Sequence, residues 1–173
     1  MANQDEFIQS HEGNFTHGRT GKIIRGFFHR TAITGDTAVG EGNYSSQHLV
    51  QASWYKVVDL NGVIVESVKA TDTEWADNQW QENVMSLNYE FTGLNGSPLT
   101  PKQISAVVSD IKADLYTKGI APHRLSQAEI KGEKVSGWGT HADITHAYSI
   151  AGGHMDSISE SEIQEILDRK SVV

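Results

Sequence analysis

Cysteine is absent from the 173 residues of the chain. Disulfide bonds, thiolate metal sites and thiol nucleophiles are therefore excluded, and any metal must be held by histidine and carboxylate side chains. Long apolar runs are also missing, and no segment has the roughly 20 apolar residues that a membrane-spanning helix needs. The N-terminus, Met-Ala-Asn-Gln-Asp-Glu, has neither a basic region nor an apolar stretch, unlike a secretory signal. We therefore expect a soluble protein that is made in the cytoplasm without a signal peptide and has no membrane insertion.

Positive charge is scarce, because 14 lysines and arginines face 22 aspartates and glutamates, giving a net charge of −8. Binding to nucleic acid and to anionic lipid both require a basic surface, so we expect neither. The length suits one domain with its own core, and the sequence contains no internal repeat and no linker. Residues 1–21 are polar and glycine-rich, and we interpret them as an N-terminal arm packed on a domain of residues 22–173.

Segments typical of strands alternate with segments typical of helices. The β-forming residues at 22–32 predict a first strand, and residues 84–91 predict another. Residues 53–59 and 63–68 predict a hairpin, because the turn between them contains Asn-Gly, the strongest short hairpin signal.

The clearest helix is expected from Thr100 to Lys118. Thr100 and Gln103 match a capping box, and Pro101 suits the first helical position. Further helical segments are expected over residues 43–51, 143–150 and 159–169. Alternating strands and helices with one antiparallel hairpin predict a single α/β domain, in which a mixed central β-sheet is flanked by α-helices.

Three stretches contain residues that could share a zinc ion. His29 ends the first strand, where α/β proteins commonly present functional groups. His141 and Asp156 lie in stretches that begin at Gly137 and Gly152, which we expect to be glycine-rich loops that let the backbone approach a ligand closely. A catalytic zinc takes three such ligands and leaves a fourth position for water, so we interpret these residues as a ligand set. The alternatives are a hydrogen-bonded buried His29, a loop histidine at 141 and a helix cap at 156, with His154 or Asp143 as the replacement ligand.

The chain resembles the zinc-dependent N-acetylmuramoyl-L-alanine amidases, the family shared with phage lysozyme-amidases and peptidoglycan recognition proteins. His29-Arg30-Thr31-Ala32 resembles the His-x-Thr-Ala motif that opens this family, and Ser86-Leu87-Asn88-Tyr89-Glu90 resembles its Ser-Ile-Gly-Ile-Glu segment. Other similar segments lie, in the family's order, at residues 14–19, 53–62, 75–76, 141–145 and 154–156. The resemblance covers roughly residues 14–158 and implies the peptidoglycan-recognition-protein and amidase type of fold.

The resemblance implies one Zn²⁺ per chain, held by His29, His141 and Asp156. It also implies that Glu90 is the catalytic glutamate and that His154 takes the place of the catalytic lysine or histidine. Glu90 would take a proton from the attacking water and pass it to the leaving amide nitrogen. His154 would donate to the oxyanion. Strand alternation places Glu90 on a face that is either solvent or a cleft.

Two positions depart from the family's pattern. Ser157-Ile158 follows Asp156 where the family has Pro-Gly, so the rigid turn that aims this carboxylate is missing. Trp54 stands where some members use a tyrosine on the hairpin strand, so the role of that tyrosine does not transfer to this chain.

Aromatic faces suit sugar rings and peptide, which makes the four tryptophans candidate walls of a substrate cleft. They are Trp54, Trp75, Trp80 and Trp138. The alternative for each of them is a place in the hydrophobic core.

The resemblance implies a peptidoglycan hydrolase that cleaves the amide bond between the lactyl group of N-acetylmuramic acid and L-alanine of the stem peptide. Without a signal or a separate cell-wall-binding domain, the chain is most similar to a phage or prophage endolysin. Such a bacteriolytic enzyme would act on the bacterial cell wall, as a monomer, after release or delivery. The alternatives are a non-catalytic peptidoglycan-recognition domain and a structural phage protein with a relic site.

Overall fold

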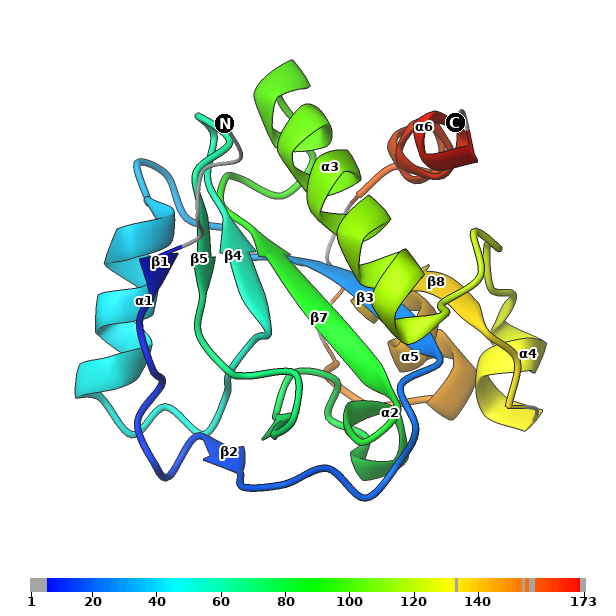
Figure 1. The fold of residues 1–173 in the computed structure, drawn as a ribbon, viewed down its shortest axis with the longest axis horizontal. Helices are drawn as coiled ribbons and strands as arrows, with labels where there is room; N and C mark the ends of the chain where they lie inside the picture. The colour runs from blue at the N-terminus through cyan, green and yellow to red at the C-terminus, as the bar shows by residue number, and fades with distance from the viewer. Residues whose placement is uncertain (1–5, 133, 154, 156–157, 172–173) are drawn as a thin grey trace.

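The computed structural model in Figure 1 describes residues 6–132, 134–153, 155 and 158–171. Within these residues a six-stranded sheet has the order β1-β5-β4-β7-β3-β8. The strands are β1 (Glu6–Phe7), β5 (Ile64–Glu66), β4 (Lys56–Val58), β7 (Ser86–Phe91), β3 (Arg25–Arg30) and β8 (Gly137–Thr140). Strands β4, β7, β3 and β8 are parallel, while β5 is antiparallel to β4 and parallel to β1. The expected mixed sheet is therefore confirmed.

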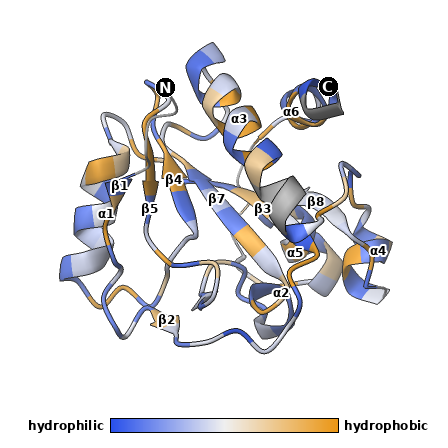
Figure 2. Ribbon diagram, viewed as in Figure 1, coloured by the Kyte–Doolittle hydropathy of each residue, from blue (hydrophilic) through white to orange (hydrophobic). Residues whose placement is uncertain are grey.

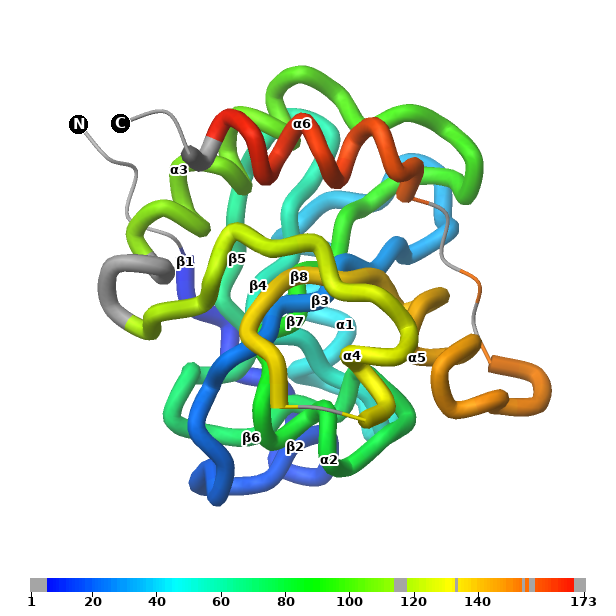
Figure 3. The backbone as a smooth tube through the Cα atoms, turned by 90° about the vertical axis from the view of Figure 1, so that its right-hand side faces the viewer, coloured from blue at the N-terminus to red at the C-terminus, as the bar shows by residue number. Residues whose placement is uncertain are grey.

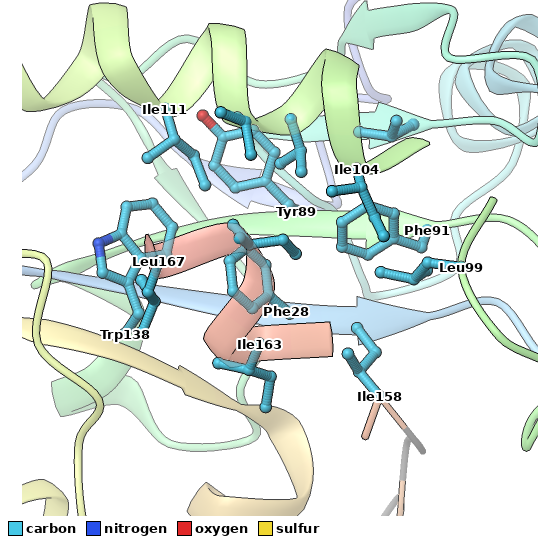
Figure 4. Close-up of a cluster of buried hydrophobic side chains, with 14 of the residues drawn as sticks. Phe28, Tyr89, Phe91, Leu99, Ile104, Ile111, Trp138, Ile158, Ile163 and Leu167 are labelled. Atoms are coloured by element: carbon cyan, nitrogen blue, oxygen red, sulfur yellow. The ribbon is translucent and has the colours of Figure 1, made fainter. Parts of the chain in front are cut away.

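One face of the sheet carries the larger core. Helices α3 (Pro101–Lys118) and α6 (Glu160–Ser171) pack on this face. Figure 4 shows aromatic side chains of β3, β7 and β8 meeting apolar side chains of the two helices. In Figure 2, α3 carries both hydrophobic and hydrophilic residues along its length, as expected for a helix that buries one side. A polar link adds to this packing, because Lys56 Nζ and the Tyr89 hydroxyl both donate to the Asp110 carboxylate on α3, at 2.6 and 2.7 Å.

The opposite face carries two smaller clusters with a gap between them. Helix α1 (Ala38–Gln47) packs through Ala38 on Val57 and Val65. Helices α4 (Gln127–Gly132) and α5 (His141–Tyr148) pack around Phe27. Figure 3 shows α3 on one side of the strands and α5 on the other. Helix α2 (Trp80–Asn83) precedes β7. The space between α1 and α5 is where the site forms.

The N-terminal segment joins the domain by strand pairing. Strand β1 extends the sheet beside β5, and β2 (Phe15–Thr16) pairs antiparallel with β6 (Thr73–Glu74). The Asn14 side chain donates to the carbonyls of Ser45 and His48, at 2.9 and 2.8 Å, which ties this segment to α1 and the turn after it.

The predicted hairpin and the predicted capping box of α3 are confirmed. Strands β4 and β5 pair antiparallel across the Asn-Gly turn, where Gly62 has φ +78°. At the start of α3, the Gln103 N–H donates to Thr100 Oγ1 at 3.1 Å, and the Thr100 N–H donates to Gln103 Oε1 at 3.0 Å. The described part of the chain contains no helix with the length and apolar character needed to cross a membrane.

Two segments differ from the expectation because their glycines serve packing rather than turns. Residues 137–140, expected as a loop, form strand β8, where a Cβ atom at Gly137 would lie 2.5 Å from the His123 carbonyl oxygen. Helix α1 begins at Ala38, five residues before the expected start, with the Thr37 side chain as its N-cap. Gly42 in this helix packs closely on Val65. Because glycine is typical of turns, the sequence did not predict strand β8 or the first half of helix α1.

Candidate functional site

Three of the predicted site residues, His29, Glu90 and His141, lie at the carboxyl ends of three neighbouring parallel strands. His29 is the next-to-last residue of β3, and Glu90 is the next-to-last residue of β7 and lies opposite His29 in the register. His141 is the first residue of α5, directly after β8. Since the carboxyl ends of neighbouring parallel strands meet at one edge, His29, Glu90 and His141 converge there although they are 61 and 51 positions apart in the sequence.

A cleft of about 280 Å³ opens at this edge. Helix α1, the start of α5 and the segments at residues 51–54 and 75–78 form its walls around the ends of β3 and β7. Its lining includes five of the predicted site residues, which are His29, Trp54, Trp75, Glu90 and His141.

The two histidines are buried neighbours. The exposed fractions of His29 and His141 are 2% and 4%, and their ring centroids lie 4.8 Å apart at an angle of 50°. Two imidazoles that share a tetrahedral zinc ion at about 2.1 Å have ring centroids on the order of 5 Å apart. The pair therefore fits the first two ligands of such an ion.

The hydrogen bonds of His29 also fit a metal ligand. Its Nε2 lies 2.8 Å from Asn88 Oδ1 and 3.2 Å from Asp77 Oδ1. Both neighbours are oxygen atoms, so a proton on Nε2 would be donated to Asn88 Oδ1. Metal-binding histidines commonly donate their second ring N–H to a carboxylate or carbonyl oxygen in this way.

Glu90 faces the cleft rather than solvent. Its exposed fraction is 3%, and it lines the cleft, while its neighbour Tyr89 points into the core on the opposite face. The alternation expected for this strand is confirmed. A carboxylate thus lies in register with His29, close to where two imidazoles converge.

The remaining predicted ligand and its catalytic neighbour, Asp156 and His154, lie outside the residues that the structure describes. In the described part of the chain, no group of three His, Asp or Glu side chains could hold a metal ion. Asp143, the alternative ligand, forms the capping box of α5, because its carboxylate accepts from the Thr140 N–H at 2.8 Å and its own N–H donates to Thr140 Oγ1. It also pairs with Arg124 at 2.9 Å. Asp143 therefore fixes the helix on which His141 stands.

The tryptophans divide between cleft, surface and core. Trp54 and Trp75 line the cleft. Trp80 is 52% exposed and lies outside the cleft lining. Trp138 is fully buried and stacks on Phe28, with ring centroids 5.2 Å apart, on the other face of the sheet. The assignment of Trp138 to the cleft is therefore wrong, because alternation along β8 turns its ring into the core (Figure 4).

Sequence reasoning did not find several residues of the site. Glu41 and Tyr44 reach the cleft from α1, whose beginning was not recognised. Burial raises the pKa of the Glu41 carboxyl to about 8, and the neighbouring Asp36 carboxylate adds to this shift. Asp77 follows β6 in a segment that predicts no regular structure. Only Asn88 had a signal, because alternation along β7 puts it on the same face as Glu90.

Comparisons with known proteins place the whole chain, rather than its single site residues. A family model described as N-acetylmuramoyl-L-alanine amidase matches residues 8–157. Curated protein sequences give no match. The Staphylococcus aureus hydrolase AmiA, solved in complex with its ligand, is similar with a TM-score of 0.72 and 18% identity, over 98% of this chain and 84% of that chain.

Two endolysin structures are similar as well. For the N-acetylmuramoyl-L-alanine amidase LysCS from Clostridium intestinale, the TM-score is 0.58 and the identity 9%, over 83% of this chain and 84% of that chain. For a mutant endolysin from Bacillus subtilis, the TM-score is 0.59 and the identity 17%, over 85% of this chain and 87% of that chain. At these identities the likeness shows a shared fold. Together with the family match over most of the sequence, it shows that the chain belongs to the N-acetylmuramoyl-L-alanine amidase family.

Proposed function

We propose that this protein is a zinc-dependent peptidoglycan hydrolase that cleaves the amide bond between the lactyl group of N-acetylmuramic acid and L-alanine of the stem peptide. The observation that carries the proposal is the convergence of two buried histidines and Glu90 in one cleft. A carboxylate beside a pair of imidazoles is a donor set suited to metal-assisted hydrolysis.

His29 and His141 would hold the zinc ion, with Asp156 as the third ligand. When bound, zinc supplies Lewis acidity, which polarises a carbonyl group and lowers the pKa of water. The oxygen atoms of Asn88 and Asp77 beside His29 Nε2 support this role. The capping box of α5 places His141 at the start of a helix whose first turn is fixed by Asp143.

Glu90 would act as the general base and then as the general acid. Its carboxylate would take the proton of the attacking water and return it to the leaving amide nitrogen. Its position in the cleft, in register with His29, supports this role. His154 would donate a hydrogen bond to the oxyanion that develops on the scissile carbonyl.

The aromatic walls would hold the substrate. Trp54, Trp75 and Tyr44 line the cleft from three different segments, and flat apolar faces of this kind pack on sugar rings and peptide. Trp80, at the surface outside the cleft, is not assigned a role in this binding.

We also propose that the protein is a phage or prophage endolysin that acts as a monomer on the bacterial cell wall after release. The fold likeness to proteins described as endolysins supports this context.

The proposal is tested by metal analysis of the purified protein together with lysis of peptidoglycan before and after chelation. We expect one zinc per chain, and lysis that is lost on chelation and restored by added zinc. New amino-terminal alanine in the digest would identify the cleaved bond. Binding to peptidoglycan without zinc and without new amino termini would replace the proposal with a recognition domain.

A further inference from the structure

A buried polar group behind the cleft holds His29 from the side opposite the proposed metal. Asp77 and Asn88 both have an exposed fraction of 0%. Their Oδ1 atoms lie 3.2 and 2.8 Å from His29 Nε2. The ring nitrogen is hydrogen-bonded to Asn88 and has the Asp77 carboxylate within ion-pair distance, so both residues face this side of the ring.

The orientation of the Asn88 amide follows from its other partners. Its Nδ2 donates to Glu74 Oε1 at 3.2 Å and to Ser86 Oγ at 3.1 Å, and it lies 3.4 Å from Asp77 Oδ2. These oxygens can all accept, so the amide nitrogen faces them and the amide oxygen faces His29. The backbone N–H of Asn88 also donates to Glu74 Oε1, at 3.1 Å, which fixes the strand at this residue.

The position of the Asp77 side chain is also fixed by hydrogen bonds. Its Oδ2 accepts from Ser86 Oγ at 3.0 Å, and its backbone N–H donates to Asn83 Oδ1 at 2.9 Å. Its Oδ1 is buried and accepts no hydrogen bond from the described residues apart from its ion-pair contact with His29. A buried carboxylate requires a charged or strongly polar donor. The buried arginines nearby already pair with other carboxylates, Arg19 with Glu74 and Arg25 with Glu82.

We propose that Asp77 and Asn88 are positioning residues for His29, which keep its ring in the Nε2–H tautomer so that Nδ1 offers its lone pair to the zinc ion. This inference rests on the proposed function in one respect, the identity of the ion. The positioning itself is a property of the metal-free protein. With the ring positioned in advance, His29 does not have to change its tautomer or orientation when the metal binds. Loss of this positioning should therefore lower the affinity for the metal and leave the chemistry at Glu90 unchanged.

The first measurement reads the tautomer directly. Long-range ¹H–¹⁵N correlation spectra of histidine-labelled, metal-free protein distinguish the Nε2–H from the Nδ1–H form, and the His29→Gln variant assigns the signal. We expect the Nε2–H form in the native protein and a mixture of both forms in the Asp77→Ala and Asn88→Ala variants. An Nδ1–H form in the native protein, or an unchanged form in both variants, would overturn the proposal.

The second measurement is zinc affinity by competition with a chromophoric chelator. We expect Asp77→Ala and Asn88→Ala each to lower the affinity by about 10- to 100-fold. Asp77→Asn is nearly isosteric and keeps an oxygen acceptor, so it should fold like the native protein and recover part of this loss. Equal affinity in all variants would show that the two residues do not serve metal binding.

A matched control is available on the other face of the sheet. Asp110 is a largely buried carboxylate that holds Lys56 and Tyr89. Asp110→Asn should lower the melting temperature without changing the tautomer of His29 or the zinc affinity. If the native protein binds no zinc, the proposed function fails, while the tautomer spectra still decide whether Asp77 and Asn88 position His29.

Discussion

Among single residues, Glu41 gives the clearest prediction of how the free energy of unfolding depends on pH. Its exposed fraction is 7%, and burial raises the pKa of its carboxyl from 4.5 to about 8. Between these two values the folded state holds a proton that the unfolded state has released. The free energy of unfolding therefore falls as pH rises through this window, by at most about 1.4 kcal/mol per pH unit.

The Glu41→Gln variant tests this statement. We expect its unfolding free energy, measured by urea denaturation, to decline less than that of the native protein between pH 4.5 and 8. Near pH 4 the two proteins should have similar stability, because the carboxyl is then protonated in both states. Parallel curves across the whole window would show that this carboxyl ionises normally in the fold.

Glu90 is the residue whose loss should separate chemistry from binding. The Glu90→Gln variant should keep its zinc and its melting temperature but lose activity by about 10²- to 10⁴-fold, since an amide cannot accept the proton of water. His29→Ala should instead lose zinc and activity together. The assay is the rate of peptidoglycan lysis with metal content measured on the same samples. Native rates in Glu90→Gln would end its role as the base.

At the residue scale, the sequence predicted which residues meet in the cleft only where a family motif marked them; their roles stay predictions. His29, Glu90 and His141 come together in the cleft as the family motifs imply. Asp77 and Glu41 belong to no recognised motif, and their burial, which decides their environment, is marked by no local pattern. Trp138 was misplaced because a ring cannot be assigned to core or cleft before the face of its strand is known.

Among the elements, β3 and α2 are joined by a buried ion pair between Arg25 and Glu82. Both Oε atoms of Glu82 lie within 2.8 Å of Arg25 Nη1, and the same guanidinium donates to the carbonyls of Glu129, Ile130 and Val135. Burial raises the pKa of the Glu82 carboxyl, and Arg25 opposes that rise. The Arg25 guanidinium therefore links both α2 and α4 to β3.

The Glu82→Gln variant should therefore be strongly destabilised, because Arg25 would keep its charge in a buried place. We expect a loss of about 3–5 kcal/mol in the free energy of unfolding, measured by urea denaturation. The double variant Arg25→Met with Glu82→Leu should recover part of this loss. A single variant as stable as the native protein would contradict the assignment of a desolvated pair.

Elements whose turns or caps depend on a few adjacent residues could be predicted from the sequence. Elements whose glycines pack against remote neighbours could not. The Asn-Gly hairpin and the capping box of α3 appear as expected, because turns and caps are decided by a few adjacent residues. Strand β8 and the start of α1 were missed. Their glycines are required by close neighbours, the His123 carbonyl and Val65, which are remote in the sequence.

At the scale of the whole molecule, the N-terminal segment is part of the fold. Strand β1 extends the sheet, Phe15 is buried, and Arg19 forms an ion pair with the buried Glu74. Arg19 also donates to the carbonyls of Ala70 and Asn83, at 3.1 and 2.6 Å. Glu74 in turn bonds Asn88, so the segment is linked to the residues behind His29.

Deletion of residues 1–21 should lower the free energy of unfolding by at least about 3 kcal/mol, because it leaves the Glu74 carboxylate buried without its arginine. Thermal unfolding of the shortened chain is the measurement. Arg19→Gln in the full chain should reproduce only part of the effect, since the strand pairing remains. A shortened chain with the native melting temperature would show that the segment is dispensable.

The alternation of β3 and β7 has a consequence for how the chain can vary. Phe28 and Tyr89 face the core, whereas the adjacent His29 and Glu90 face the cleft. A substitution at one position disturbs one face, but inserting or deleting a single residue inside either strand turns every following side chain over. Rings would then meet water while charges enter the core. We therefore expect these two strands to tolerate changes of identity but not of length, so that insertions and deletions are confined to the loops around the cleft.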